Sequence, residues 1–274
     1  LLNHQPMGFY PPRVLLHEAR LWGIPIYPLD INASQPEFTL ENGGIRVGLR
    51  ALQGLTEEHI ATICAVRKER PFSSLADFRW RVHLPRKVMR NLVRIGAFAA
   101  FGTVPDLLQQ LTIYEQPKSR LPQGQCLLPL PPEASALASS PAPDLKRAIS
   151  TELELTDLYI TGHPLSLFRS LLTSYEAIDS RRLRTCADGQ KVRVAGIIVS
   201  RQMPPTRSKQ RIIFLTIEDE YGLIDVTVLP QEQKKYAQVA LGCALLLVEG
   251  TVRKTGTESI SVTAARLFDL RRLA

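Results

Sequence analysis

The last third of the chain alternates hydrophobic and polar residues in short segments, which is the pattern of half-buried β-strands. A turn at Glu220-Tyr221-Gly222 separates the second segment from the third, and a short polar helix is expected at about Gln231–Val239. The expected strands are Lys191–Arg201, Arg211–Glu218, Leu223–Leu229, Ala244–Arg253 and Ser259–Arg266.

Three strands, a helix and two further strands form the element order of a five-stranded barrel of the oligonucleotide/oligosaccharide-binding (OB) type. Gly196 lies inside the long first strand, where a bend would let that strand serve both sides of a small barrel. OB barrels bind their ligands on strands two and three and on the first and last inter-strand loops. Binding residues are therefore expected on this face and in these loops.

Cations gather at those two loops, 202–210 and 254–258. Cationic loops beside a barrel face suit a phosphate backbone, and aromatic side chains suit stacking on bases. Hairpin tips also carry Lys and Arg simply because they are solvated, and the aromatic residues fit a hydrophobic core equally well. The candidates for single-strand binding are Arg201, Arg207, Lys209, Arg211, Arg253 and Lys254, with Phe214 and Tyr221 as stacking residues.

Residues 52–67 (LQGLTEEHIATICAVR) fit a helix-hairpin-helix motif, in which a glycine-containing hairpin precedes a helix. The free N–H groups of such a hairpin and the positive helix end can hold a phosphate without reading the base. Gly54 and Thr56 are the contact candidates. Thr56 stands where the motif usually has a second glycine, and Glu57 and Glu58 would repel an anion, so a purely structural hairpin is the alternative.

A basic helix is expected at Pro85–Ile95, with apolar residues on one side and cations on the other. It ends in Gly96-Ala97-Phe98, a second, degenerate hairpin. Four cations with no acidic residue among them favour a phosphate-binding face over a merely solvated one. The duplex-binding candidates of this helix are Arg86, Lys87, Arg90, Arg94 and Gly96.

The other segments predict smaller elements. Prolines recur from Pro117 to Pro143, so 114–143 is interpreted as a linker. His163 lies between Gly162 and Pro164 in a turn and is interpreted as architectural. We also expect helices at Arg13–Trp22, Leu145–Tyr159 and Leu165–Leu172, a capped helix start at Phe72–Phe78, and a hairpin between Phe38–Leu40 and Ile45–Leu49.

Charge divides the 274-residue chain into two basic modules. The net charge is +8, with 11 basic and 4 acidic residues between Arg46 and Arg94 and 13 basic and 8 acidic residues from Gln190 onwards. This clustering indicates two surfaces for a polyanion. The four cysteines have no zinc or redox spacing, and no apolar run approaches the roughly 20 residues of a membrane span. We therefore expect a reduced, cytoplasmic protein without membrane contact.

No pattern of catalytic or metal-binding residues is evident. Two-metal nucleotidyl transfer needs carboxylates placed together. The only dense acidic run, Glu218-Asp219-Glu220, stands at a strand end before a turn, where closing a hairpin is the simpler role. No glycine loop followed by Lys-Ser/Thr is present either. The chain is thus expected to hold no catalytic residue, metal or cofactor of its own.

The order of these motifs resembles the C-terminal part of the alpha subunit of bacterial DNA polymerase III, of the C family. The opening QPMGFYPP and the short chain after the barrel resemble the error-prone branch, whereas YITGHP resembles the replicative branch. The segments that carry the resemblance are Gln5–Tyr10, Leu29–Asn32, Gln53–Arg67, Ser74–Phe78, Ile95–Phe98 and Tyr159–Pro164.

The resemblance implies an α+β chain, with a helical tandem helix-hairpin-helix domain followed by a five-stranded OB barrel. The implied organisation is 1–45 as the end of a fingers domain, 46–113 as the duplex-binding domain, 114–143 as linker, 144–189 as helical connector and 190–270 as OB domain. The resemblance also implies that the palm and its Mg²⁺-binding aspartates lie upstream of this chain. The chain alone would then not polymerise DNA.

The expected partners are duplex and single-stranded DNA, with accessory polymerase subunits as further candidates. Two other functions remain open. The barrel and the basic helices could form an adaptor that binds a protein of the replication or repair machinery, or the barrel could bind RNA. Phosphate binding weakens steeply with salt, whereas an apolar protein contact does not.

Overall fold

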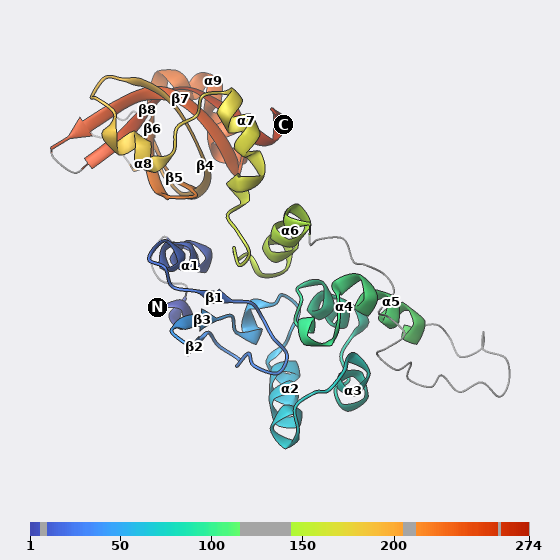
Figure 1. Cartoon of the computed structure of the whole chain (residues 1–274). Coiled ribbons are helices and arrows are strands. Elements are labelled where there is room, and N and C mark those ends of the chain that lie inside the picture. The colour runs from blue at the N-terminus through green and yellow to red at the C-terminus, as the bar shows by residue number, and fades with distance from the viewer. Residues whose placement is uncertain (6–9, 116–143, 205–211, 257–258, 274) are drawn as a thin grey trace. The chain divides into compact units, whose positions relative to one another are not determined.

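The chain folds into two compact units, each described here by itself (Figure 1). The computed structural model describes residues 1–5, 10–115, 144–204, 212–256 and 259–273. The first unit combines Leu1–Trp22 with Gly162–Ala274, and the second comprises Gly23–Thr161. The segments 1–45 and 144–189 each divide between the two units. Within the described ranges, no helix is long and apolar enough to cross a membrane.

A closed five-stranded barrel forms most of the first unit (Figure 1). The strand order around it is β4-β5-β6-β8-β7, and all neighbours are antiparallel except β6 and β8, which are parallel. Helix α9 (Pro230–Gly242) follows the third strand, so the predicted OB order is confirmed. The strands are β4 (Lys191–Gln202), β5 (Ile213–Asp219), β6 (Gly222–Val228), β7 (Leu245–Thr255) and β8 (Ser259–Asp269).

The first strand, β4, serves both sides of the barrel, as its length and its glycine predicted. Its first part pairs with β7 and its second with β5, and the register shifts between Ile198 and Ser200. A Cβ on Gly196 would lie 2.8 Å from Ile217 Cβ and 2.9 Å from the Glu218 carbonyl oxygen. Only glycine therefore allows β5 to cross β4 this closely.

A second glycine controls the packing of β7 against β8. The register shifts between Glu249 and Gly250, which marks a bulge. A Cβ on Gly250 would meet the Thr263 carbonyl oxygen and would lie 2.6 Å from Val262 Cγ1. Inside the barrel, alternate residues of all five strands form one apolar cluster that includes Val194, Ile217 and Val226.

Short helices cover the barrel. They are α1 (Pro12–Leu21), the 3₁₀ turn η6 (Pro164–Phe168), α7 (Arg169–Ser174) and α8 (Ser180–Thr185). The single helix predicted at Leu165–Leu172 is divided into the 3₁₀ turn η6 and the α-helix α7. Helix α8 was not predicted, since its six residues SRRLRT contain one large apolar side chain and give no periodicity.

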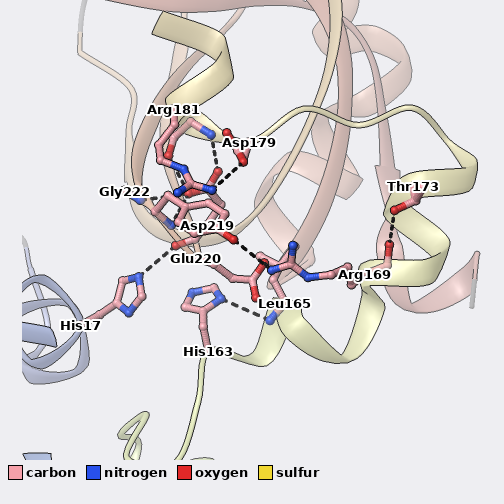
Figure 2. A network of polar contacts seen from close by, with 12 residues as sticks. His17, His163, Leu165, Arg169, Thr173, Asp179, Arg181, Asp219, Glu220 and Gly222 are labelled. Carbon is pink, nitrogen blue, oxygen red and sulfur yellow. Dashed lines mark hydrogen bonds and ion pairs between the residues drawn. The ribbon is translucent and has the colours of Figure 1, made fainter. Parts of the chain in front are cut away.

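Asp219, at the end of β5, organises the region where these helices meet the barrel (Figure 2). Its carboxylate accepts the N–H groups of Tyr221 and Gly222 at 2.8 and 2.9 Å, which closes the β5–β6 turn. It also accepts the Ser180 hydroxyl at 2.7 Å at the start of α8. Its carbonyl oxygen lies 3.1 Å from His17 Nε2 on α1. One residue thus joins a turn, two helices and a strand end.

Two histidines and a glutamate are buried beside Asp219. The rings of His17 and His163 lie 4.8 Å apart, and His163 Nε2 lies 3.8 Å from Glu218 Oε2. Because His163 Nδ1 accepts the Leu165 N–H, its proton belongs on Nε2, which faces Glu218. Burial lowers the pKa of His163 to about 4 and that of His17 below its ordinary value, and it raises the pKa of Glu218 to about 7.

The second unit contains a three-stranded sheet in the order β1-β3-β2 and a set of helices. The hairpin predicted around Asn42-Gly43 is present as β2 and β3, and the predicted basic helix is α4. The elements are β1 (Ile26–Tyr27), β2 (Thr39–Glu41), β3 (Gly44–Arg46), η2 (Leu49–Ala51), α2 (Glu57–Glu69), α3 (Leu75–Arg81), α4 (Arg86–Arg94), η3 (Ala99–Phe101), α5 (Val104–Glu115) and α6 (Leu145–Thr156).

An aromatic chain forms the centre of the second unit. Phe78 packs edge-on against Phe72 and Phe98, with ring centroids 4.8 and 5.0 Å apart. Arg67 is buried nearby and donates to the carbonyl oxygens of Ile31 and Ser34 at 2.9 and 2.8 Å. This cation is therefore a structural residue that ties α2 to the segment between β1 and β2.

The crowding at Gly250 predicts a large stability effect. Replacing Gly250 with Ala should lower the free energy of unfolding of the barrel unit by about 1–3 kcal/mol, because the added methyl group meets backbone atoms that cannot move away. Gly242→Ala is the matched control, since a Cβ there has nothing within 4 Å. It should be neutral or stabilising by up to about 1 kcal/mol. Urea unfolding of both variants measures the two changes in the free energy of unfolding. Equal changes for Gly250→Ala and Gly242→Ala would contradict the prediction.

The buried Glu218 predicts a pH effect of known sign. Its folded pKa of about 7 exceeds its ordinary value of 4.5, so the folded state binds the extra proton, and this contribution to stability is lost as pH rises from 4.5 through 7. Glu218→Gln stays neutral, so its stability relative to the wild type should increase from pH 5 to pH 8. Amide hydrogen exchange in β5 and β6 measures the stability of the variant and of the wild type at each pH.

Glu232→Gln on α9 is the control for this pH effect, because Glu232 does not belong to the buried group. Its difference from the wild type should stay constant over the same pH range. A Glu218→Gln difference that is also independent of pH would show that Glu218 is ionised in the folded protein, contrary to the prediction.

Candidate nucleic-acid interface

The first hairpin of the second unit lies between η2 and α2. Gly54 has φ +92°, a left-handed conformation that glycine adopts without strain. The Thr56 hydroxyl accepts the His59 N–H and His59 Nδ1 accepts the Thr56 N–H, both at 3.3 Å, so Thr56 is the N-cap of α2. Within the described residues, the N–H groups of Gly54, Glu57 and Glu58 have no acceptor. These are the donors left for an anion.

One of the two carboxylates at the start of α2, that of Glu57, is compensated. Arg50 donates to both carboxylate oxygens of Glu57, at 2.7 and 2.9 Å, and also bonds Glu37. These hydrogen bonds hold the pKa of the Glu57 carboxyl below its ordinary value. The repulsion expected from Glu57 is therefore reduced by a cation that sequence spacing alone did not assign to it.

The four cations of α4 differ in their surroundings. Arg94 donates to both carboxylate oxygens of Glu154 on α6, at 3.0 and 2.6 Å, and Arg90 donates to the Thr112 hydroxyl at 3.1 Å. Arg86 and Lys87 are exposed and meet no hydrogen-bond or ion-pair partner in the part of the chain that the structure describes.

The first turn of α4 lies against the first hairpin. A Cβ placed on Gly54 would be 3.8 Å from Val88 Cγ2, and Val88 directly follows Arg86 and Lys87 in sequence. The open N–H donors and the two uncompensated cations thus belong to one neighbourhood, which is the arrangement that a phosphate contact requires.

Gly96 has a different local role. With φ +84°, it ends α4: its N–H donates to the Val93 carbonyl oxygen, and the Ala97 N–H donates to that of Leu92, both at 3.0 Å. This is a Schellman cap, which satisfies the last carbonyl groups of a helix. The N–H groups of this second hairpin are already used within the fold.

On the barrel, cross-strand pairing places Phe214 in a row of hydroxyl side chains. The register joins Thr251 to Thr263, Thr263 to Thr227, Thr227 to Phe214, and Phe214 to Gln202. Phe214 is 40% exposed at the start of β5, where the alternation of the strand turns it out of the core. An exposed ring flanked by hydroxyl groups suits base stacking with hydrogen bonds beside it.

A parallel row contains both charged groups of this surface. Arg253 pairs with Ser261, Ser261 with Asp225, and Asp225 with Thr216, whose hydroxyl lies 3.0 Å from the Asp225 carboxylate. Arg253 and Asp225 are both exposed. A phosphate would therefore approach the Arg253 end of this row and avoid the β6 strand, where Asp225 repels it.

The remaining single-strand candidates are dispersed. Arg201 donates to the carbonyl oxygens of Ala240 and Cys243 at 3.1 and 2.6 Å and so completes the C-terminus of α9. The Lys254 N–H donates to Asp188 at 2.9 Å, and its ammonium group lies 3.5 Å from the Arg184 carbonyl oxygen. The expected cations Arg207, Lys209 and Arg211 lie outside the described residues.

Tyr221 is at the other end of β5 from Phe214. The guanidinium group of Arg181 lies 3.4 Å from its ring centroid, and Arg169 donates to its hydroxyl at 3.2 Å. One face of the ring is therefore occupied by a cation–π contact. The structure does not bring the two aromatic candidates together, and Phe214 is the one with an open side chain.

The acidic run at the end of β5 has structural partners. Glu218 is buried beside two histidines, Asp219 closes the turn, and Glu220 forms an ion pair with Arg169 (Figure 2). In the described ranges no group of three or more His, Cys, Asp or Glu side chains is arranged to hold a metal ion.

The hydroxyl residues of the face were missed by the sequence analysis. Thr227 pairs with Phe214 across the β5–β6 hairpin, and Thr263 joins this row only through the parallel β6–β8 pairing, which no local pattern reveals. Strand alternation would have placed Thr216 on the same face as Phe214, two positions away. That signal was present in the sequence and was not used.

Two family comparisons match these units. The family described as a helix-hairpin-helix motif matches residues 23–105, and the family described as an OB-fold nucleic acid binding domain matches residues 192–270. Among solved structures, asparaginyl-tRNA synthetase from Pyrococcus horikoshii matches 34% of this chain and 22% of that chain, at 21% identity and a TM-score of 0.30. That likeness is too distant to carry an argument.

Longer matches are found among error-prone DNA polymerases. That of Pseudomonas aeruginosa is 33% identical over 282 residues, covering 100% of this chain and 26% of the relative. That of Brucella melitensis is 30% identical over 280 residues, covering 98% of this chain and 25% of the relative. The chain thus spans about a quarter of the length of these relatives.

The order of motifs along the chain, the two domain matches and these relatives agree. The resemblance to a C-family polymerase is confirmed, and these relatives are of the error-prone branch, which the opening QPMGFYPP and the short chain after the barrel indicated. Along its whole length, the chain is similar to the C-terminal part of the error-prone DNA polymerases, with a helix-hairpin-helix motif followed by an OB-fold nucleic acid binding domain.

Proposed function

We propose that the chain is the DNA-binding portion of an error-prone DNA polymerase, acting in DNA replication and translesion synthesis. The helix-hairpin-helix unit holds the primer–template duplex through its phosphates, and the barrel holds the single-stranded template. The observation that carries the proposal is that Val88, which directly follows the uncompensated cations Arg86 and Lys87 on α4, lies beside the hairpin with the free N–H donors. Residues 1–45, 46–113, 144–189 and 190–270 would then correspond to the fingers end, the duplex-binding domain, the connector and the OB domain.

Contact with the duplex rests on two components. The N–H groups around Gly54 and the N-terminus of α2 provide neutral donors and a positive helix end. Arg86 and Lys87 provide the charge, whereas Arg94 already neutralises Glu154. Neither component reads a base edge, which fits a protein that must accept any sequence.

Contact with a single strand rests on Phe214 and the hydroxyl groups beside it. Stacking on an exposed aromatic ring contributes about 1–3 kcal/mol per base and tolerates every base. Arg253 and Lys254 at the last loop supply charge for the backbone. In this arrangement Tyr221 is a structural residue, and the contribution of Arg207, Lys209 and Arg211 comes from the first loop.

A pair of matched lysines tests the duplex contact. Lys87→Glu should weaken binding of a 20-base-pair duplex about tenfold and reduce the slope of log affinity against log salt by about 1, because one phosphate contact is lost. Lys68→Glu is the control. Lys68 is exposed in the last turn of α2, at the end of that helix away from the hairpin, so the same charge change there should leave the affinity for the duplex within about twofold. Fluorescence anisotropy at several salt concentrations measures both.

The outcomes separate the alternatives. Equal losses in the two variants would mean that only overall charge matters, and the hairpin assignment would be wrong. Wild-type binding that does not respond to salt would point to the adaptor function instead. A strong preference for RNA over DNA in competition would favour the RNA-binding alternative.

A further inference from the structure

The outer surface of the barrel contains a cleft at a place that the DNA-binding face does not use. It lies between α8 and the outward side of β4, β7 and β8 and has a volume of about 440 Å³. The charged side chains that line it are Arg182, Lys191, Arg193, Arg266, Glu176 and Glu249. Four cations thus face two carboxylates across one hollow.

The ion pairs in the cleft leave positive charge uncompensated. Arg193, Glu249 and Arg266 are direct cross-strand neighbours, and the single carboxylate of Glu249 lies 2.8 Å from Arg193 and 3.7 Å from Arg266. Among the described residues, Arg182 and Lys191 have no carboxylate within ion-pair distance. The cleft therefore carries a net charge of about +2 and suits an anionic ligand.

The strand register connects the cleft with the face that carries Phe214. Lys191 pairs with Thr251, the first residue of the row that continues through Thr263 and Thr227 to Phe214. Four strand-to-strand steps of about 4.8 Å separate the two ends, or roughly 19 Å around the barrel. Hydroxyl side chains line the whole interval, and no acidic side chain belongs to this row.

We propose that the cleft is a second binding site for a single strand and takes phosphodiester groups of the same strand whose bases lie on the β5–β6 face. This inference rests on the proposed single-strand function of the barrel. Arg182 and Lys191 contact the phosphates, and Arg193 and Arg266 exchange part of their contact with Glu249 for the ligand. An OB barrel extended in this way covers more nucleotides than its β5–β6 face alone, within the roughly 4–16 nucleotides that such domains occupy.

The continuity of the row favours a nucleic acid over an acidic peptide as the ligand. An acidic peptide would have to bind in the cleft without any contact along the row to Phe214. A strand already bound at Phe214 carries further phosphates that can reach the cleft without ordering any more of the protein. Glu176, a lining carboxylate with φ +53°, weakens the site and provides a variant with the opposite effect.

The test compares a short and a long oligonucleotide on the full chain. Arg182→Ala/Lys191→Ala should lower the affinity for a 20-nucleotide oligothymidine about tenfold, and should make its salt slope shallower by about 1.4, since a single strand loses about 0.7 per phosphate. The same variant should bind a 3-nucleotide oligothymidine, which is too short to reach the cleft from Phe214, within twofold of the wild type. Glu176→Gln should raise the affinity for the long oligonucleotide alone.

Two control variants make the result specific. Lys234→Ala/Lys235→Ala removes the same charge from exposed positions of α9 that do not line the cleft. It should leave the affinities for the short and the long oligonucleotide unchanged. Phe214→Ala should weaken both lengths. If the wild type binds neither oligonucleotide at low salt, the proposed function fails.

If the wild type binds both but the cleft variant matches it on the long one, only the cleft proposal fails. Equal losses on both lengths would also overturn the cleft proposal. So would a 20-residue polyglutamate that competes as well as the long oligonucleotide for the wild type.

Discussion

The close approach of β7 and β8 at Gly250 is the constraint on which the barrel surface depends. With no Cβ at this position, the bulge forms and the two strands cross at backbone distance. Closure of the barrel then determines which outward-facing residues are neighbours. Thr227 and Thr263, for example, lie side by side across the parallel strands β6 and β8. The ligand-facing row is therefore a product of barrel geometry rather than of any local motif.

Charge compensation separates the cations that we propose to bind DNA from the structural ones in both units. Arg67, Arg94 and Arg201 are bound to carbonyl or carboxylate oxygens of their own unit. Among the described residues, no such oxygen binds the side chains of four other cations, each of which belongs to a helix or strand at a hairpin or a cleft: Arg86, Lys87, Arg182 and Lys191. A cation already engaged by the protein has less to gain from a phosphate, so composition alone overstates the size of an anion-binding surface.

Local periodicity predicted the elements well because strands and helices are defined by short-range repetition. The five barrel strands, α4 and the β2–β3 hairpin were predicted from alternation, helical spacing and a turn. Long-range pairings were beyond that method. Arg94 and Glu154 are 60 residues apart, and His17 and Asp219 are 202 apart, so spacing could not show that one cation was compensated or that α1 packs on β5. Six-residue α8, which forms one wall of the cleft, is too short to produce a period.

The first unit is assembled from both ends of the chain, with 139 residues of the second unit between Trp22 and Gly162. Helix α1 emerges from the ribosome long before β5, whose Asp219 carbonyl oxygen it contacts. Contacts between residues so far apart in the sequence form slowly during folding. Docking of α1 is consequently a late event in biosynthesis, and until it occurs the side chains of His163 and Glu218 lack their α1 cover and can exchange protons with the solvent.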